Sequence, residues 1–171
     1  MVVITIKDIM NEVDAVLQRY DRAVELNTRI CSRDPSIWHR PDTNEFTALR
    51  ALLTPLAEGG EMRCQYALAT IYWLGFCCES EEQYLRDYGE AIKIATRWWI
   101  AAASQGHYYA LDNLITCGVG AEADSVKEAR RQFEEQNKDL VGWSHNMPVY
   151  GPDFMQALCK SVYGCVVTDE E

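Results

Sequence analysis

Residues 61–75, EMRCQYALATIYWLG, and residues 87–110, DYGEAIKIATRWWIAAASQGHYYA, decide the fold of this chain. The first segment places apolar or small residues at spacings of three and four: Cys64, Ala67, Leu68, Ile71, Tyr72 and Gly75. The second segment does the same with Ala91, Ile94, Ala95, Trp98, Ala102 and Ala103, and Gly106 follows it. Because one face of an α-helix recurs about every 3.6 residues, these spacings predict two amphipathic helices. Each is closed by a glycine, the residue that most easily adopts a left-handed C-cap.

A third helix is expected directly after Gly106, through Tyr109, Ala110, Asn113 and Leu114. Small residues on one helix face, large aromatics on the other and a glycine at each corner are what closely stacked helical hairpins require. We therefore expect an all-α fold, a compact α-solenoid of antiparallel helical hairpins.

The same stretch resembles the Sel-one-like repeats, short relatives of the tetratricopeptide repeats. Matching positions are Gln65, Tyr66, Ala67, Leu68, Tyr72, Gly75, Trp98, Ala102, Ala103, Gln105, Gly106, His107, Ala110 and Leu114. The chain departs from the pattern at Cys64 and Ala69, in a long corner at 76–86 and in an extra turn before Trp98. The resemblance covers roughly a third of the chain. It implies a core role for Trp98 and a structural role for His107 at a helix end.

The flanking segments predict further helices in one domain, 1–171. A helix is expected over 8–31 with Asp8 as N-cap, and another from Asp42 or Thr43, kinked or restricted by Pro55. Repeat-like hairpins, about two repeats, are expected over 43–142. The N-terminal helix and the segment 143–171 are expected to cap the array, because an unpaired repeat leaves an apolar side exposed.

The C-terminal part predicts two more helices. The first is capped by Asp124 or Ser125, and its apolar stripe consists of Val126, Ala129, Phe133 and Leu140. A loop with Pro148, Gly151 and Pro152 precedes the second, which runs from Asp153 to about Tyr163 and ends at Gly164.

The charge balance narrows the range of partners. The chain has 16 basic and 26 acidic residues, a net charge of −10. Nucleic acids and acidic membrane surfaces attract clustered Lys and Arg, so we predict neither as a partner. A basic protein partner is favoured, because opposite charge accelerates encounter. The alternative is that the charge only maintains solubility.

The sequence has seven cysteines, which is an odd number, and it has no CxxC pair and no recognisable secretory signal. We therefore predict reduced thiols and a cytoplasmic location. Cys64 and Cys159 lie at apolar helix positions and are expected in the core. The adjacent pair Cys77-Cys78 is interpreted as structural or incidental. None of the three histidines has metal-ligand spacing with another ligand, so we predict no metal and no cofactor.

Catalytic motifs are missing from the sequence. It contains no GxSxG, P-loop or GxGxxG pattern, and the neighbouring carboxylates of Glu81-Glu82 or Glu134-Glu135 diverge on a helix. We expect no enzyme activity. An enzyme would need a pocket that unites distant groups such as His39, His145 and Cys77.

Two groups of residues are candidates for binding a protein partner. The first comprises aromatics that flank the expected core positions: Trp73, Trp99, Tyr108 and Tyr109. The second belongs to the acidic corner 76–86: Phe76, Glu79, Glu81, Glu82 and Tyr84. Aromatic anchors combine a large contact area with few rotamers. The alternatives are packing of the aromatics against the N-terminal helix or cap, and a solvated helix start for the acidic residues.

These features predict a non-enzymatic module that binds and inhibits one protein target, such as an immunity protein against a bacterial antagonistic toxin. The alternative is a general adaptor, scaffold or regulator in a larger assembly, because proteins that resemble this family usually have such roles. Exposed apolar edges of a helical stack also suggest self-association as a homodimer.

Overall fold

The computed structural model describes residues 5–11, 13–15, 18, 43–73, 81–144 and 147–167. Residues 6–11, 13–15 and 18 are helical. The labelled elements follow in this order: α2 (Thr43–Glu58), α3 (Met62–Trp73), α4 (Glu81–Ala103), α5 (Tyr108–Thr116), α6 (Ala121–Gln136), the 3-10 helix η1 (Lys138–Leu140), β1 (Val141–Ser144), β2 (Met147–Tyr150) and α7 (Pro152–Tyr163). The described chain is mostly helical, which confirms the predicted class.

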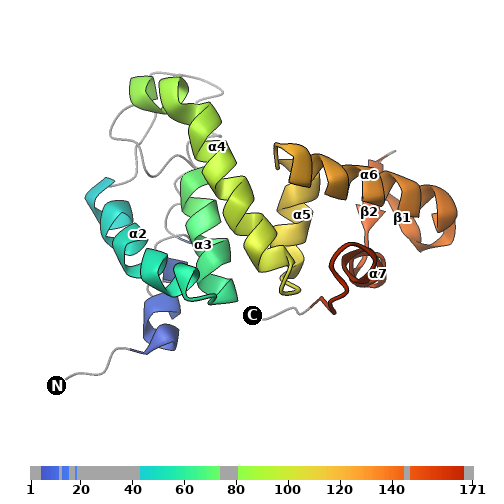
Figure 1. Ribbon diagram of the computed structural model, residues 1–171, viewed down its shortest axis with the longest axis horizontal. Coiled ribbons are helices and arrows are strands. Elements are labelled where there is room, and N and C mark those ends of the chain that lie inside the picture. Colours follow the sequence, from blue (N-terminus) through green and yellow to red (C-terminus); the bar gives the residue numbers. More distant parts are fainter. Residues whose placement is uncertain are drawn as a thin grey trace.

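Helices that follow one another in the sequence pack against one another (Figure 1). Contacts join α2 to α3, α3 to α4, α4 to α5 and α5 to α6, while α7 contacts both α5 and α6. The long helix α4 therefore lies between the N-terminal and the C-terminal helices. The short antiparallel hairpin β1–β2 precedes α7.

Two clusters of buried side chains form the core. One is built from the N-terminal helix, α2 and α3, and includes Met10, Val13, Leu53 and Cys64. The other extends from Ala69 of α3 through α4, α5 and α6 to Cys159 and its neighbours in α7. Cys64 and Cys159 are both fully buried, as predicted. Tyr72 and Trp98 pack against both clusters, so the interface between α3 and α4 joins them.

The buried stripe of α4 differs from the predicted one. Trp99 is 1% exposed, whereas Trp98 is only partly buried. The buried residues of α4 are Ala91, Ile92, Ala95, Thr96, Trp99, Ala102 and Ala103. The stripe is rotated because the α5–α6 corner covers this side of α4, where the Val119 amide donates a 3.2 Å hydrogen bond to Thr96 Oγ1. The prediction that Trp99 faces a partner is wrong.

The corner between α4 and α5 ends in the predicted left-handed glycine. Gly106 has φ 100°, and the amides of Gly106 and His107 donate to the carbonyls of Ala103 and Ala102 at 2.9 and 3.2 Å. These bonds satisfy the last carbonyls of α4. A side chain at position 106 would collide with the backbone carbonyl of Val166, so the chain after α7 packs directly on this corner.

A buried glutamine joins three helix ends. Gln65 is 5% exposed, and its Nε2 donates a 3.0 Å hydrogen bond to the Ala57 carbonyl in the last turn of α2. Its Oε1 accepts a 2.8 Å hydrogen bond from Gln105 Nε2, just after α4. Buried amides that find both kinds of partner fix the geometry around them. This network sets the ends of α2 and α4 against α3.

Several helix boundaries differ from the predicted ones. The N-terminal helix begins before Asp8, which instead accepts hydrogen bonds from the Thr5 amide and hydroxyl, while Thr5 Oγ1 accepts from the Asp8 amide. This exchange is that of a capping box. Most of the predicted span 8–31 lies outside the described residues. Helix α2 starts at Thr43 and continues past Pro55 to Glu58.

Helix α6 begins at Ala121, so Asp124 and Ser125 do not cap it. Glu122 and Asp124 lie in its first turn, where negative charge stabilises the helix N-terminus. The helix ends at Gln136, and Leu140 therefore leaves the predicted stripe and is 37% exposed. The predicted last helix is confirmed as α7, with Gly164 as a left-handed C-cap.

Substitution of three glycines should separate backbone strain from the contact at the α4–α5 corner. We expect Gly106→Ala to lower the free energy of unfolding by about 2–4 kcal/mol, because it adds a collision with Val166 to the cost of positive φ. Gly60→Ala, with φ 94° but open space, should cost about 1 kcal/mol. Gly89→Ala, inside α4 and unobstructed, should stabilise by about 0.5–1 kcal/mol.

Urea unfolding monitored by circular dichroism measures all three. Equal costs for the variants at Gly106 and Gly60 would show that the packing of Val166 contributes nothing.

Candidate functional site

The predicted contact residues do not form one surface. Trp99 belongs to the core, and Trp73 is partly buried with its ring centroid 5.4 Å from that of Trp99. Trp73 thus mainly serves packing between α3 and α4. The alternative interpretation placed these side chains against the N-terminal helix or the cap, whereas the two rings contact each other between α3 and α4.

The acidic corner is shorter than predicted. Phe76 and Glu79 lie outside the described residues, as do Cys77, Cys78, His39 and His145. Glu81 is the first residue of α4, Glu82 is exposed, and Tyr84 belongs to the helix. Residues 81–86 therefore form the start of α4, and the exposed Glu82 agrees with the alternative interpretation of a solvated helix start. The Glu82 carboxylate lies near the positive end of the helix dipole.

The other predicted aromatics lie at the opposite end of α4. A helix of 23 residues is about 35 Å long, so Glu82 is far from the start of α5. Tyr108 and Tyr109 begin α5, and Tyr109 is 54% exposed. No compact contact surface includes both ends of α4.

Four rings form a cluster at the start of α5, which we call the α5 aromatic cluster: Tyr66, His107, Tyr108 and Tyr109. The Tyr66 ring stacks on His107 with centroids 4.3 Å apart, and Tyr109 contacts Tyr108 edge to face at 5.1 Å. Tyr109 is also 6.3 Å from both other rings. The stacked rings of Tyr66 and His107 both lie near Tyr109, whose side chain remains exposed.

His107 is the structural residue of this cluster. Its Nδ1 accepts a 3.3 Å hydrogen bond from the Ala110 amide, so it caps α5. The backbone amide of His107 donates to the Ala102 carbonyl at the end of α4, so the residue serves both helix ends, as its predicted structural role implies. Burial, with a smaller effect of the nearby Arg63 charge, lowers the pKa of His107 to about 4. The neutral ring is the form that can accept the capping bond.

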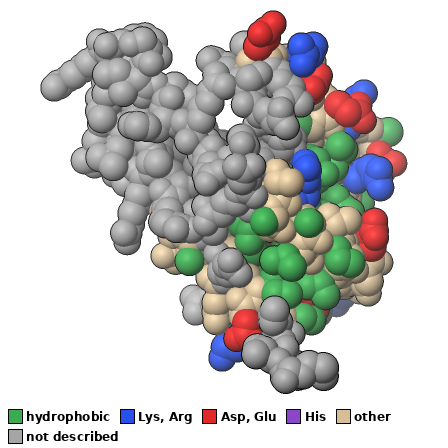
Figure 2. Space-filling model, turned by 90° about the vertical axis from the view of Figure 1, so that its left-hand side faces the viewer, with side chains coloured by type: hydrophobic (Ala, Val, Ile, Leu, Met, Phe, Trp, Pro, Cys, Tyr) green, Lys and Arg blue, Asp and Glu red, His purple; other side chains and the backbone are tan. Residues whose placement is uncertain are grey.

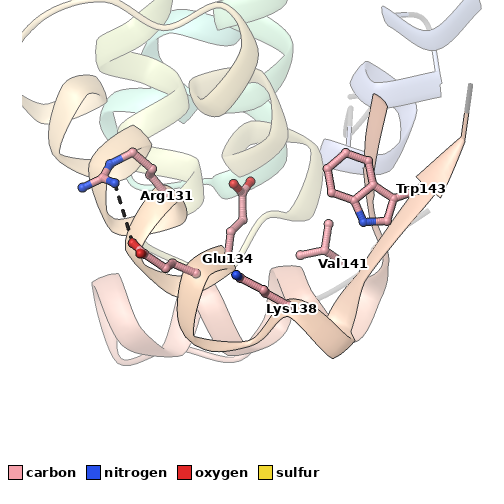
Figure 3. A pocket seen from close by; sticks show the side chains of 6 residues that line it. Arg131, Glu134, Lys138, Val141 and Trp143 are labelled. Atoms are coloured by element: carbon pink, nitrogen blue, oxygen red, sulfur yellow. Dashed lines mark ion pairs between the residues drawn. The ribbon is translucent and has the colours of Figure 1, made fainter. Parts of the chain in front are cut away.

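A second candidate lies on the C-terminal side, outside the two predicted groups of contact residues. A pocket of about 510 Å³ opens between the end of α6, η1 and strand β1 (Figure 3). We call it the hairpin pocket. Its lining residues are Arg131, Glu134, Glu135, Lys138, Val141 and Trp143. Trp143 is 71% exposed, the largest value among the exposed large hydrophobic residues of the described chain.

Ion pairs hold the α6 wall of the hairpin pocket. Arg131 pairs with Glu128 at 2.8 Å and with Glu135 at 3.8 Å, the second shown in Figure 3. The hydrogen bonds from Arg131 and Gln132 lower the pKa of Glu128 to about 2. Because the pairs are solvent-exposed, they orient side chains more than they stabilise the fold.

Glu134 joins this wall to the hairpin. Its Oε1 accepts a short hydrogen bond from the Tyr150 hydroxyl and lies 3.5 Å from Arg130 Nε. Burial, followed by the bond to Glu134, raises the pKa of Tyr150 to about 12, so the phenol stays protonated as the donor. Arg130 also lies over the Tyr150 ring at 5.5 Å. The hairpin is thereby fastened to α6.

The same tyrosine connects the two candidate sites. The Tyr108 hydroxyl donates a 3.5 Å hydrogen bond to the Tyr150 carbonyl, and Tyr150 is paired with Val141 of the pocket wall. The α5 aromatic cluster and the hairpin pocket therefore share a support. Chemically, the pocket offers an apolar wall beside charges of both signs, a setting for the side chains of a protein partner.

This segment was predicted as a loop from Pro148, Gly151 and Pro152, and the structure shows a two-stranded hairpin instead. In a two-stranded hairpin, however, each strand has a free edge, where proline is tolerated. Pro148 pairs with Trp143. The alternation Val141, Trp143 and the β-branched Val149 is the sequence signal that could have revealed it.

Comparisons with protein-family models, with curated proteins and with solved structures gave no match to this chain. No described helix has the length and apolar character needed to cross a membrane. Within the described ranges, no group of three or more His, Cys, Asp or Glu side chains is arranged to hold a metal ion.

The pKa of His107 predicts a dependence of stability on pH. In the unfolded chain His107 takes up its proton near pH 6.5, but in the folded chain only near pH 4. The contribution of neutral His107 to the free energy of unfolding is therefore complete above pH 6.5 and is lost as the pH falls toward 4. Relative to His107→Asn, which retains a capping acceptor, the wild type should lose about 2 kcal/mol between pH 7 and 4.

Urea unfolding of both proteins at pH 7, 6, 5 and 4 provides the test. A constant difference over this range would contradict the buried neutral histidine.

Proposed function

We propose that this protein is a non-enzymatic binding protein that recognises and inhibits one protein target, as an immunity protein does for a bacterial antagonistic toxin. The observation that carries the proposal is the exposed indole of Trp143 beside the hairpin pocket. A tryptophan that is left 71% exposed on a fastened hairpin offers a large contact area at a low entropic cost. Tyr109 provides a second anchor on the neighbouring cluster.

The charge of the chain supports a basic partner. A net charge of −10 attracts a positively charged surface over a distance of about one Debye length. Glu135 of the pocket has 72% of its side chain exposed and is available at its rim. Electrostatic attraction would then accelerate encounter, while the aromatic anchors would set the rate of dissociation.

The proposal includes a fold of about two Sel-one-like repeats, capped at both ends, in the cytoplasm. It is supported by the sequential packing of α2 to α5 and by the glycine corner at Gly106. Helical repeat proteins present binding residues on surfaces formed by successive hairpins.

The experiment is affinity capture from lysate of the native cell at low and high salt, followed by measurement of the dissociation constant for the captured protein. Trp143→Ala should weaken binding about 30-fold, as expected for a central hot-spot residue. Val119→Ala, which shortens another exposed hydrophobic residue, 41% exposed at the α5–α6 corner, is the matched control and should change affinity less than about twofold.

One stoichiometric basic partner whose activity is blocked would support the inhibitor. Many substoichiometric partners would indicate the adaptor instead. Equal affinity of the wild type and Trp143→Ala for the partner would show that the hairpin pocket is not part of the binding surface.

The side of the molecule near α2 is a further surface on which hydrophobic side chains gather, with charged ones around them (Figure 2). Leu52 of α2 is 43% exposed. The proposed homodimer would use such an apolar edge. Sedimentation of the wild type and of Leu52→Glu, which places a charge in the edge, should show dimer dissociation in the variant; a wild type that is monomeric at high concentration would exclude the dimer.

A further inference from the structure

Two thiols meet where the chain turns back after α7. Cys159 is buried in α7, and Cys165 is partly buried just beyond it. Between them, Gly164 adopts φ 71° and reverses the chain. The two Sγ atoms lie 2.6 Å apart. Because a disulfide bond is about 2.05 Å long, the pair is about half an ångström from bonding distance.

The surroundings hold both thiols at the end of α4. Cys159 Sγ lies 3.8 Å and Cys165 Sγ 3.7 Å from the Ala103 carbonyl oxygen. The next residue, Val166, packs its carbonyl over Gly106. An interaction that holds Cys165 in place therefore also holds residues 165–167 on the α4–α5 corner. This corner carries His107, the N-cap of α5.

We propose that Cys159 and Cys165 are a site of reversible disulfide formation with a low-molecular-weight disulfide such as oxidised glutathione, and that the bond clamps residues 165–167 onto the α4–α5 corner. The inference does not depend on the proposed function. It departs from the expectation that the seven thiols stay reduced.

The exchange is balanced. The Cys165 thiolate attacks one sulfur of the small disulfide, so a mixed disulfide forms and one small thiolate leaves. The Cys159 sulfur, having lost its proton to water, then attacks the Cys165 sulfur, and the second small thiolate leaves. The protein loses two protons and two electrons, and the small disulfide takes them up as it is reduced to two thiols.

The order of attack follows from exposure. Cys159 is fully buried, and burial together with the neighbouring Cys165 raises its pKa to about 12, so it is not the first thiol to react. The partly buried Cys165 is more accessible to a small disulfide. Once Cys165 is in the mixed disulfide, its thiol no longer contributes to the raised pKa of Cys159.

The sequence allows a direct test, because Lys160 lies between the two cysteines and trypsin separates them. Native protein is incubated with oxidised glutathione, the remaining thiols are alkylated, and the digest is analysed by mass spectrometry without reduction. We expect peptide 139–160 joined to peptide 161–171, with a mass two hydrogens below the sum of the two peptides. Dithiothreitol should separate them.

Two cysteine variants test which thiols form the disulfide bond. Cys165→Ser should abolish the joined peptide, and Cys117→Ser, which removes another partly buried thiol, should leave it unchanged. Oxidation should raise the melting temperature of the wild type and of Cys117→Ser by about 5 °C, but not that of Cys165→Ser. Stable glutathione on Cys165, unmodified thiols at both positions, or a bond from Cys165 to another cysteine would overturn the proposal.

Discussion

The burial of the Trp99 indole ring of α4, beside Trp73 of α3 and within the larger core, is the constraint on which the rest of the structure depends. Trp99 is 1% exposed, yet within the described part of the chain its Nε1 has no hydrogen-bond partner. Burying roughly 200 Å² of aromatic surface contributes about 5 kcal/mol, whereas an unpaired N–H costs about 1–3 kcal/mol. Burial of the ring therefore outweighs the lost hydrogen bond.

Small residues make this arrangement feasible. Ala95, Ala102 and Ala103 of α4 and Ala69 of α3 are all fully buried, so large side chains do not hold the helices apart. The helix that carries Trp99 is then followed by a corner with little freedom, where Gly106 meets Val166 and His107 caps α5. Both candidate sites lie beyond this corner: Tyr109 is on α5, and Trp143 is on the hairpin that Tyr150 ties to α5 and α6.

The sequence patterns predicted the features that depend on neighbouring residues in the chain. The helices α3, α4, α5 and α7 and the left-handed corners at Gly106 and Gly164 follow from periodicity and glycine conformation. The register of α4 did not follow, because the choice between Trp98 and Trp99 depends on which neighbours cover the helix. The exposure of a side chain also depends on which neighbours cover it. Trp143 is a binding candidate because no described element covers it, and the spacing of residues in the sequence cannot show that.

The two cores meet at the interface between α3 and α4, where Trp99 of α4 packs against Trp73 of α3, so the predicted single domain should unfold as one unit. Hydrogen exchange measured by mass spectrometry on the wild type and Trp99→Ala tests this most directly, with the slowest amides of α2 and α7 as reporters. Since loss of a buried tryptophan costs about 3–5 kcal/mol, we predict that protection falls by about two to four orders of magnitude in both helices alike. Loss of protection in α7 with unchanged protection in α2 would mean that the two cores are independent and would contradict this account.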